Sequence, residues 1–218
     1  MNSIHDTVTL VPWQASWQTA FAEERQRITA AIHAAGLAAA VYHVGSTSVQ
    51  GMVSKPIIDI LVCPVGGAAP EQAAAALARI GYADLGECGR PGRRFLSKGD
   101  EPGKTFYVHV CDRDHPVARD QLFFQDLERG VPEVAESYMR LKQALAVCFP
   151  DDRYAYREVK GCYIRGVLDA ARYAVTLPVE TPFAIDLPNS GAAQETRNGR
   201  RKTLTREDIE RMLRDFGQ

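Results

Sequence analysis

The sequence has no apolar run near the length of about 18 residues that a membrane-spanning helix requires. Its N-terminus lacks the basic-then-apolar pattern of a secretion signal. It also lacks an excess of charge of either sign: the formal net charge is −1 at pH 7, whereas domains that bind nucleic acid are normally basic. These absences predict a cytoplasmic protein, with neither nucleic acid nor a membrane among its partners.

Two kinds of motif are also missing. No GxxxxGK[ST] run is present, so the chain offers no P-loop and kinase chemistry cannot be assigned to it. The five cysteines are odd in number, widely spaced and free of any CxxC pair, which argues against a disulfide framework. We expect these cysteines to be reduced and mostly buried.

The most informative stretch of the chain runs from His43 to Cys63. It contains Gly45, Ser46, Thr47 and Ser48, small residues whose backbone amides can approach an anion closely. The run PIIDILVC at 56–63 then predicts a buried strand, apolar on both faces except at Asp59. An ionised carboxylate there costs several kcal/mol unless a cation or hydrogen-bond donors compensate it. The stretch therefore predicts a phosphate site beside a carboxylate.

This stretch, GSTSVQGMVSKPIIDILV, resembles the signature of the GrpB family, a branch of the nucleotidyltransferase superfamily. The resemblance continues through GRPGRRF at 89–95, VHV at 108–110 and residues 156–165. It implies that Gly45 and Ser46 hold nucleotide phosphates and that Asp59 binds Mg²⁺ or Mn²⁺. Two positions depart from the pattern: Gln50 stands in place of a proline, and Leu61 in place of the second carboxylate. The second departure puts two-metal chemistry in question.

Strand alternation selects His109 as a companion of Asp59. In a strand at 104–111, His109 shares a face with Thr105, Tyr107 and Cys111, and it meets Asp59 if the two faces coincide. A carboxylate and an imidazole make half of a divalent metal site, but they are also an ordinary buried hydrogen-bonded pair. The resemblance favours a functional role over a structural one, since His109 matches the third metal or base position of the superfamily.

Four cations complete the predicted phosphate site. Arg93 and Arg94 follow a Gly-Arg-Pro-Gly turn and must point to opposite faces of the next strand, so one of them can reach a phosphate, although exposed arginines are common. Lys160 interrupts the apolar stripe of a helix, where it either extends its stem toward solvent or aims its ammonium into the site. The resemblance includes Lys160 and favours the second interpretation. The predicted phosphate site also includes Lys55, which comes just before the strand of Asp59.

Other polar residues have ordinary explanations. His43 precedes the turn and is expected to be a structural neighbour. Asp112, Asp114 and His115 spell DRDH, a metal-like run, but Asp114 and His115 before Pro116 are also a common start of a helix.

The sequence predicts an α+β fold, a nucleotidyltransferase-like mixed sheet flanked by helices, with a helical C-terminal half and an extended tail. Residues 1–175 form the GrpB-like domain, 176–203 a linker, and 204–218 a short helix that can mediate homo-oligomerisation. Expected helices are 13–35, 68–80, 116–128, 132–149 and 151–175; expected strands are 8–11, 41–44, 56–63, 82–88, 93–98 and 104–111.

Three functions remain open at this stage. The first is a metal-dependent enzyme that binds a nucleoside triphosphate and transfers a nucleotidyl group to a small acceptor, with Asp59, His109 and Lys160 as catalytic residues. The second is a binding module that keeps the phosphate pocket without turnover, which Leu61 supports. The third is a protein-interaction domain built on the helical half.

Overall fold

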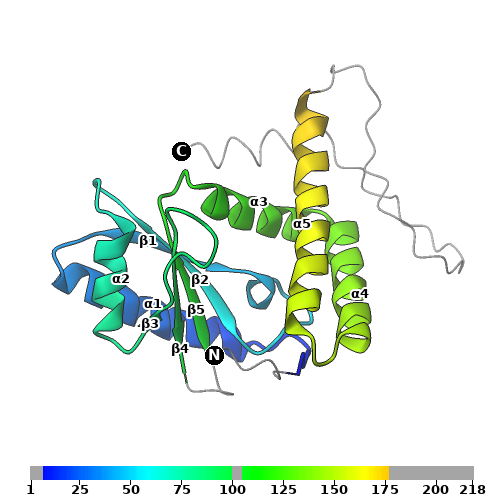
Figure 1. The fold of residues 1–218 in the computed structure, drawn as a ribbon, viewed down its shortest axis with the longest axis horizontal. Helices are drawn as coiled ribbons and strands as arrows, with labels where there is room; N and C mark the ends of the chain where they lie inside the picture. Colours follow the sequence, from blue (N-terminus) through cyan, green and yellow to red (C-terminus); the bar gives the residue numbers. More distant parts are fainter. Residues whose placement is uncertain (1–6, 100–104, 177–218) are drawn as a thin grey trace, which may run out of the picture.

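The structure is a computed structural model that describes residues 7–99 and 105–176. In this part of the chain, five strands form one open sheet in the order β1-β2-β5-β4-β3, with five α-helices around it (Figure 1). The strands are β1 Ala39–Val44, β2 Ile58–Pro64, β3 Ala83–Asp84, β4 Arg94–Lys98 and β5 Phe106–Val110. The helices are α1 Ser16–Ala34, α2 Pro70–Ala78, α3 Pro116–Gly130, α4 Pro132–Cys148 and α5 Arg153–Thr176, with a 3₁₀ turn η1 at Ser46–Ser48.

The sheet is mixed. β2 and β5 are parallel, whereas β1 pairs with β2, β4 with β5 and β3 with β4 in antiparallel fashion. The chain leaves β2 through α2 and returns through β3 and β4 before it reaches β5, which gives the long crossover that a parallel pair requires. The predicted α+β class and mixed sheet are therefore confirmed.

One face of the sheet is covered by α1 and α2. Alternate residues of β2 and β5 point into this layer, among them Ile60 and Val108, both fully buried. The helical stripe predicted in α1 packs against them, through Trp17, Phe21, Ile28 and Ile32. Burial of these side chains contributes about 1.5 to 3 kcal/mol each and holds this layer together.

The same stripe of α1 contains one acidic residue, Glu24, which is fully buried. Its carboxylate accepts hydrogen bonds from Lys98 Nζ at 2.7 Å, Tyr82 Oη at 3.0 Å and Arg27 Nη1 at 3.0 Å. Burial alone would raise the pKa of Glu24, but these hydrogen bonds outweigh it and lower the pKa. Glu24 therefore links α1 to the edge of the sheet as a structural ion.

The other face of the sheet carries the helical half. Ala118 and Leu122 of α3 pack on Val44 of β1, Leu61 of β2 and Cys111, which directly follows β5. Helices α3, α4 and α5 form a bundle around the segment after η1, which inserts Val49 and Met52 between them. Figure 1 shows α4 and α5 running side by side, with the strands in the middle of the molecule.

Three sequence predictions differ from the structure. The strand expected at 8–11 is reduced to a single bridge between Val11 and Ser54. The strand expected at 82–88 ends at Asp84, because the chain turns through Gly86, Cys88 and Gly89, all with positive φ. The expectation of mostly buried cysteines is wrong: all five are free, but only Cys63 and Cys111 are buried.

None of the helices within 7–99 and 105–176 combines the length and apolar composition needed to cross a membrane. The predicted linker beyond Thr176 and the helix at 204–218 lie outside the described residues.

Candidate functional site

The turn between β1 and β2 lies directly against Asp59. Gly45 has φ 69° and ψ −176°, a conformation essentially restricted to glycine. A β-carbon built on Gly45 would lie 2.8 Å from Oδ2 and 3.3 Å from Cγ of Asp59. Glycine is therefore required twice, for its backbone conformation and for the close approach of turn and carboxylate.

The first hydroxyl of the turn meets a buried lysine. Lys142 of α4 is 2% exposed, and its Nζ donates to Ser46 Oγ at 2.9 Å and to the Val53 carbonyl at 2.5 Å. The ammonium also lies 4.6 Å from the centroid of the Tyr138 ring, within the range of a cation–π contact. Burial lowers the pKa of Lys142 and raises the pKa of the neighbouring Glu128.

The next two residues of the turn hold it in place. Thr47 is fully buried; its Oγ1 lies 3.0 Å from Nε2 of His43, and its carbonyl accepts from Trp13 Nε1 at 3.2 Å. Ser48 Oγ donates to the Gly45 carbonyl at 2.5 Å and accepts from the Gln125 amide. The His43 ring stacks on Phe21 at 4.5 Å. These side chains fix the shape of the turn, as expected for His43.

Asp59 is surrounded by cations. Its carboxylate is withdrawn from water although part of the residue is exposed, and this burial raises the pKa of Asp59. The charges of Lys160, Lys55 and Arg153 oppose that rise. Two of these, Lys55 and Lys160, are residues that the sequence placed in the site.

The charges of two carboxylates act on Lys160. Burial lowers the pKa of its ammonium, while Asp59 and Glu128 raise it. Glu128 of α3 is 4% exposed, and its Oε1 has no hydrogen-bond partner among the described residues. Asp59, Lys160, Lys142 and Glu128 thus form a charge cluster drawn from β2, α5, α4 and α3, in which Lys142 and Glu128 are buried and Asp59 and Lys160 are half-buried. Lys142 links the cluster to the hydroxyl of Ser46.

His109 lies on the same face of the sheet as Asp59, but it is not the residue directly opposite Asp59 on the neighbouring strand. The register pairs Asp59 with Tyr107, and Leu61 with His109. Arg93 Nη1 donates to His109 Nδ1 at 3.2 Å, and the His109 ring lies 5.1 Å from the ring of Phe95. Burial, with the charge of Arg93, lowers the pKa of His109 to about 3, so the imidazole is neutral at pH 7.

The two arginines after the GRPG turn point to opposite faces, as strand alternation requires. Arg93 is 7% exposed on the Asp59 face and donates to the carbonyls of Glu87 at 2.7 Å and Cys88 at 3.3 Å. Arg94 pairs in register with Val110 on the face of α1 and α2, where it binds Asp84 at 2.7 Å. The structure therefore brings Arg93 toward the site and places Arg94 away from it.

In the metal-like run at 112–115, the histidine has a structural role. Nδ1 of His115 accepts from the amide of Val117 at 3.1 Å and caps α3, while Nε2 lies 2.8 Å from the Pro91 carbonyl. Within residues 7–99 and 105–176, no group of three His, Cys, Asp or Glu side chains could hold a metal ion.

Sequence reasoning missed Lys142, Glu128 and Arg153. The signal that singled out Lys160 was also available for Lys142, which interrupts the apolar stripe of Val134, Tyr138 and Leu145 on α4. Arg153 gave no such signal, because its contact with Tyr107 depends on how the start of α5 lies over the sheet: Arg153 Nη2 donates to Tyr107 Oη at 2.6 Å.

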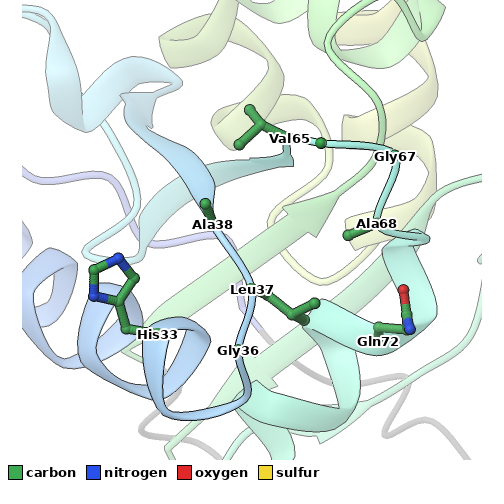
Figure 2. A pocket seen from close by; sticks show the side chains of 9 residues that line it. His33, Gly36, Leu37, Ala38, Val65, Gly67, Ala68 and Gln72 are labelled. Atoms are coloured by element: carbon green, nitrogen blue, oxygen red, sulfur yellow. The ribbon is translucent and has the colours of Figure 1, made fainter.

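A separate hollow of about 740 Å³ lies between the end of α1 and the start of α2 (Figure 2). It is lined by His33, Gly36, Leu37, Ala38, Val65, Gly66, Gly67, Ala68 and Gln72. Gln72 is engaged there, since its Oε1 accepts from the amide of Ala69. The hollow shares no residue with the Asp59 cluster and lacks its charges, so we place the candidate site at Asp59.

Comparison with known proteins agrees with the signature around this site. A family model described as GrpB protein matches residues 7–170. A UPF0157 protein of Pseudomonas aeruginosa is 36% identical over 183 residues, which cover 82% of this chain and 73% of that protein. The UPF0157 protein YqkA of Bacillus subtilis is 32% identical over 76% of this chain, but the match spans only 47% of YqkA.

A solved structure extends the likeness to the fold. The crystal structure of conserved protein GrpB from Enterococcus faecalis superposes with a TM-score of 0.61 and 30% sequence identity, over 73% of this chain and 99% of that one. The family match at residues 7–170 includes Gly45, Asp59, Lys142 and Lys160. The chain belongs to the GrpB family.

Proposed function

We propose that this protein binds a nucleoside triphosphate through its phosphate groups at the Gly45–Ser48 turn. The observation that supports the proposal is the convergence of Ser46, Lys142 and Lys160 beside Asp59. Hydroxyl and ammonium donors are the groups that hold phosphate oxygens, and their burial strengthens each interaction.

The surplus of cations around Asp59 favours an anionic ligand. The charges of Lys55, Lys160 and Arg153 all act on this one carboxylate, and Lys142 donates a hydrogen bond to Ser46. These cations explain how an acidic residue is tolerated in an otherwise apolar strand. Asp59 alone does not balance their positive charge, whereas a bound phosphate chain would.

The donor set fits a divalent metal that arrives with the ligand. Mg²⁺ is commonly bound by one or two carboxylates together with substrate phosphates and water. Asp59 would be its protein ligand, whereas His109 has its Nδ1 engaged by Arg93. A bound Mg²⁺ or Mn²⁺ would neutralise charge on the phosphates.

Nucleotidyl transfer to a small acceptor is a second candidate, favoured by the contact between the phosphate turn and Asp59. Position 61 weighs against two-metal chemistry, since Leu61 is fully buried under Ala118 and Leu122 of α3. In this candidate Lys160 stabilises charge on the transferred group, and acceleration comes from positioning and charge neutralisation.

Calorimetric titration with ATP, with and without Mg²⁺, tests binding. Lys142→Met combined with Ser46→Ala should weaken ATP binding more than tenfold, about 1.4 kcal/mol. Asp59→Asn should remove the part of the affinity that depends on Mg²⁺. Arg94→Gln is the matched control, because it removes a cation bound to Asp84 on the opposite face of the sheet.

Equal ATP affinity in the wild type and the Ser46/Lys142 variant would contradict the proposal. Release of pyrophosphate from ATP in the presence of candidate acceptors would separate transfer from binding alone. Transfer requires a release rate that falls in Asp59→Asn.

A further inference from the structure

Three rings lie in a row on the exposed part of the Asp59 face. Phe95 of β4 is flanked by Tyr107 at 5.2 Å and His109 at 5.1 Å between ring centroids, with interplanar angles of 43° and 49°. All three residues are half-buried, whereas their neighbours Leu96, Phe106, Val108 and Val110 on the opposite face are buried. The row is thus a partly exposed aromatic surface in the sheet, although the imidazole of His109 is largely withdrawn from water.

This aromatic row is continuous with the phosphate cluster. Tyr107 is the register partner of Asp59, and paired residues of neighbouring strands lie about 5 Å apart. Arg153 joins the two regions, since it donates to Tyr107 Oη and its charge acts on Asp59. A ligand whose phosphates lie at Ser46 can therefore extend across Asp59 onto the row.

Two guanidinium groups border the row. Arg93 Cζ lies 5.0 Å from the centroid of Phe95, and Arg153 Cζ lies 6.0 Å from the centroid of Tyr107. Arg93 is held in place by the carbonyls of Glu87 and Cys88, while its buried Nε has no partner among the described residues. An aromatic surface bordered by cations suits a planar, electron-rich ring that accepts hydrogen bonds.

Aromatic pairs on neighbouring strands also occur as ordinary packing. Packing alone would not require the row to stay half-exposed, nor to adjoin a cluster with surplus positive charge. A nucleobase stacked on protein aromatic rings contributes affinity without requiring a particular base.

We propose that Phe95, Tyr107 and His109 form a stacking platform for the base of the nucleotide. This inference rests on the proposed function, because the phosphates of the same ligand occupy the Gly45–Ser48 turn. Arg153 acts as a positioning residue between the two halves of the ligand.

Comparison of ATP with inorganic tripolyphosphate by calorimetry separates the contribution of the base to affinity from that of the phosphates. Wild-type protein should bind ATP about tenfold more tightly than tripolyphosphate, given the usual contribution of one stacked base. Phe95→Leu should remove most of that ratio and leave tripolyphosphate affinity unchanged. Tyr173→Leu removes a 64% exposed aromatic side chain on the last turns of α5 and should keep the wild-type ratio.

The outcomes distinguish the two proposals. If wild-type protein binds tripolyphosphate and ATP equally, the stacking platform is wrong and the phosphate site stands. If it binds neither, the proposed function is wrong, and the stacking platform is then wrong as well. A wild-type ratio near one would overturn the platform even if Phe95→Leu fails to fold, which a thermal melt will reveal.

Discussion

Gly45 and Asp59 lie so close together that a β-carbon on Gly45 would be 2.8 Å from Oδ2 of Asp59. Real β-carbons essentially never approach an atom this closely, so any other residue at position 45 must displace the turn or the strand. The turn and the carboxylate are therefore a single unit, and its geometry can be tested by substitution.

Gly45→Ala should lower the free energy of unfolding by about 1 to 3 kcal/mol from backbone strain alone, and by more because of the clash with Asp59. Gly51→Ala is the matched control, since Gly51 has φ 83° and a β-carbon there would meet nothing within 4 Å. Urea denaturation measures both variants. A Gly45→Ala cost no larger than that of Gly51→Ala would show that the contact with Asp59 is not rigid.

The pairing of Lys142 with Glu128 predicts coupled stability. Lys142→Met removes a cation that lowers the pKa of the buried Glu128, so it should destabilise the fold. Glu128→Gln in the same chain should recover part of the loss, with an interaction free energy of about 0.5 to 3 kcal/mol. Recovery of stability without recovery of ATP affinity would separate the role of Lys142 in binding from its role in folding; strictly additive losses would exclude the coupling.

Buried neutral histidines predict loss of stability in acid. Burial lowers the pKa of His43 from 6.5 to about 4 and that of His109 to about 3. Below pH 6.5 the unfolded chain binds protons that the native state does not, so stability falls as the pH decreases toward these values. From pH 7 to pH 5 each histidine should contribute a loss of about 2 kcal/mol.

His43→Gln should make this pH dependence shallower by about 2 kcal/mol, whatever its effect on absolute stability. His33→Gln, at an exposed position on α1, is the control. Urea denaturation at pH 7 and pH 5 gives the comparison, in which contributions from other groups cancel. An unchanged slope in His43→Gln would mean that the pKa of this histidine is the same in the native state as in the unfolded chain.

The Glu24 network predicts a stability defect that leaves the site intact. Glu24→Gln removes the charge that faces Lys98, which is 25% exposed, and Arg27, which is 62% exposed. It should destabilise the fold by about 1.5 to 3 kcal/mol, the usual range for hydrogen bonds to a charged group, because both cations keep access to water. Glu136→Gln breaks a pair that is about 60% exposed on both sides and should cost less than about 1 kcal/mol. A Glu24→Gln protein that melts earlier but binds ATP normally would fit this view; weakened ATP binding in folded protein would contradict it.

Local patterns in the sequence were sufficient for most of the framework. The small residues at 45–48 and the apolar run at 56–63 predicted a turn followed by a buried strand, because both depend on neighbours along the chain. Proline at the start of α2, α3 and α4 likewise predicted where these helices begin. The short strand β3 was overestimated, since the positive φ of Cys88 is not visible in its residue type.

The opposite faces of Arg93 and Arg94 also followed from the sequence, since alternation fixes one relative to the other. Which of them points toward Asp59 did not, because it depends on the antiparallel register that places Phe95 opposite His109. The parallel register of β2 and β5 decided that Asp59 pairs with Tyr107 and not with His109.

The charge cluster required the tertiary structure. Lys142, Glu128 and Lys160 are far from Asp59 in the sequence. The sequence singled out Lys160 as a candidate, but it did not bring Lys142 or Glu128 to the site. Their convergence depends on how α3, α4 and α5 pack around Val49 and Met52, which is set by long-range apolar contacts. The sequence by itself determined the turn, the carboxylate and the faces of each element; only packing decided which cations surround that carboxylate, because side-chain burial depends on neighbours that are distant along the chain.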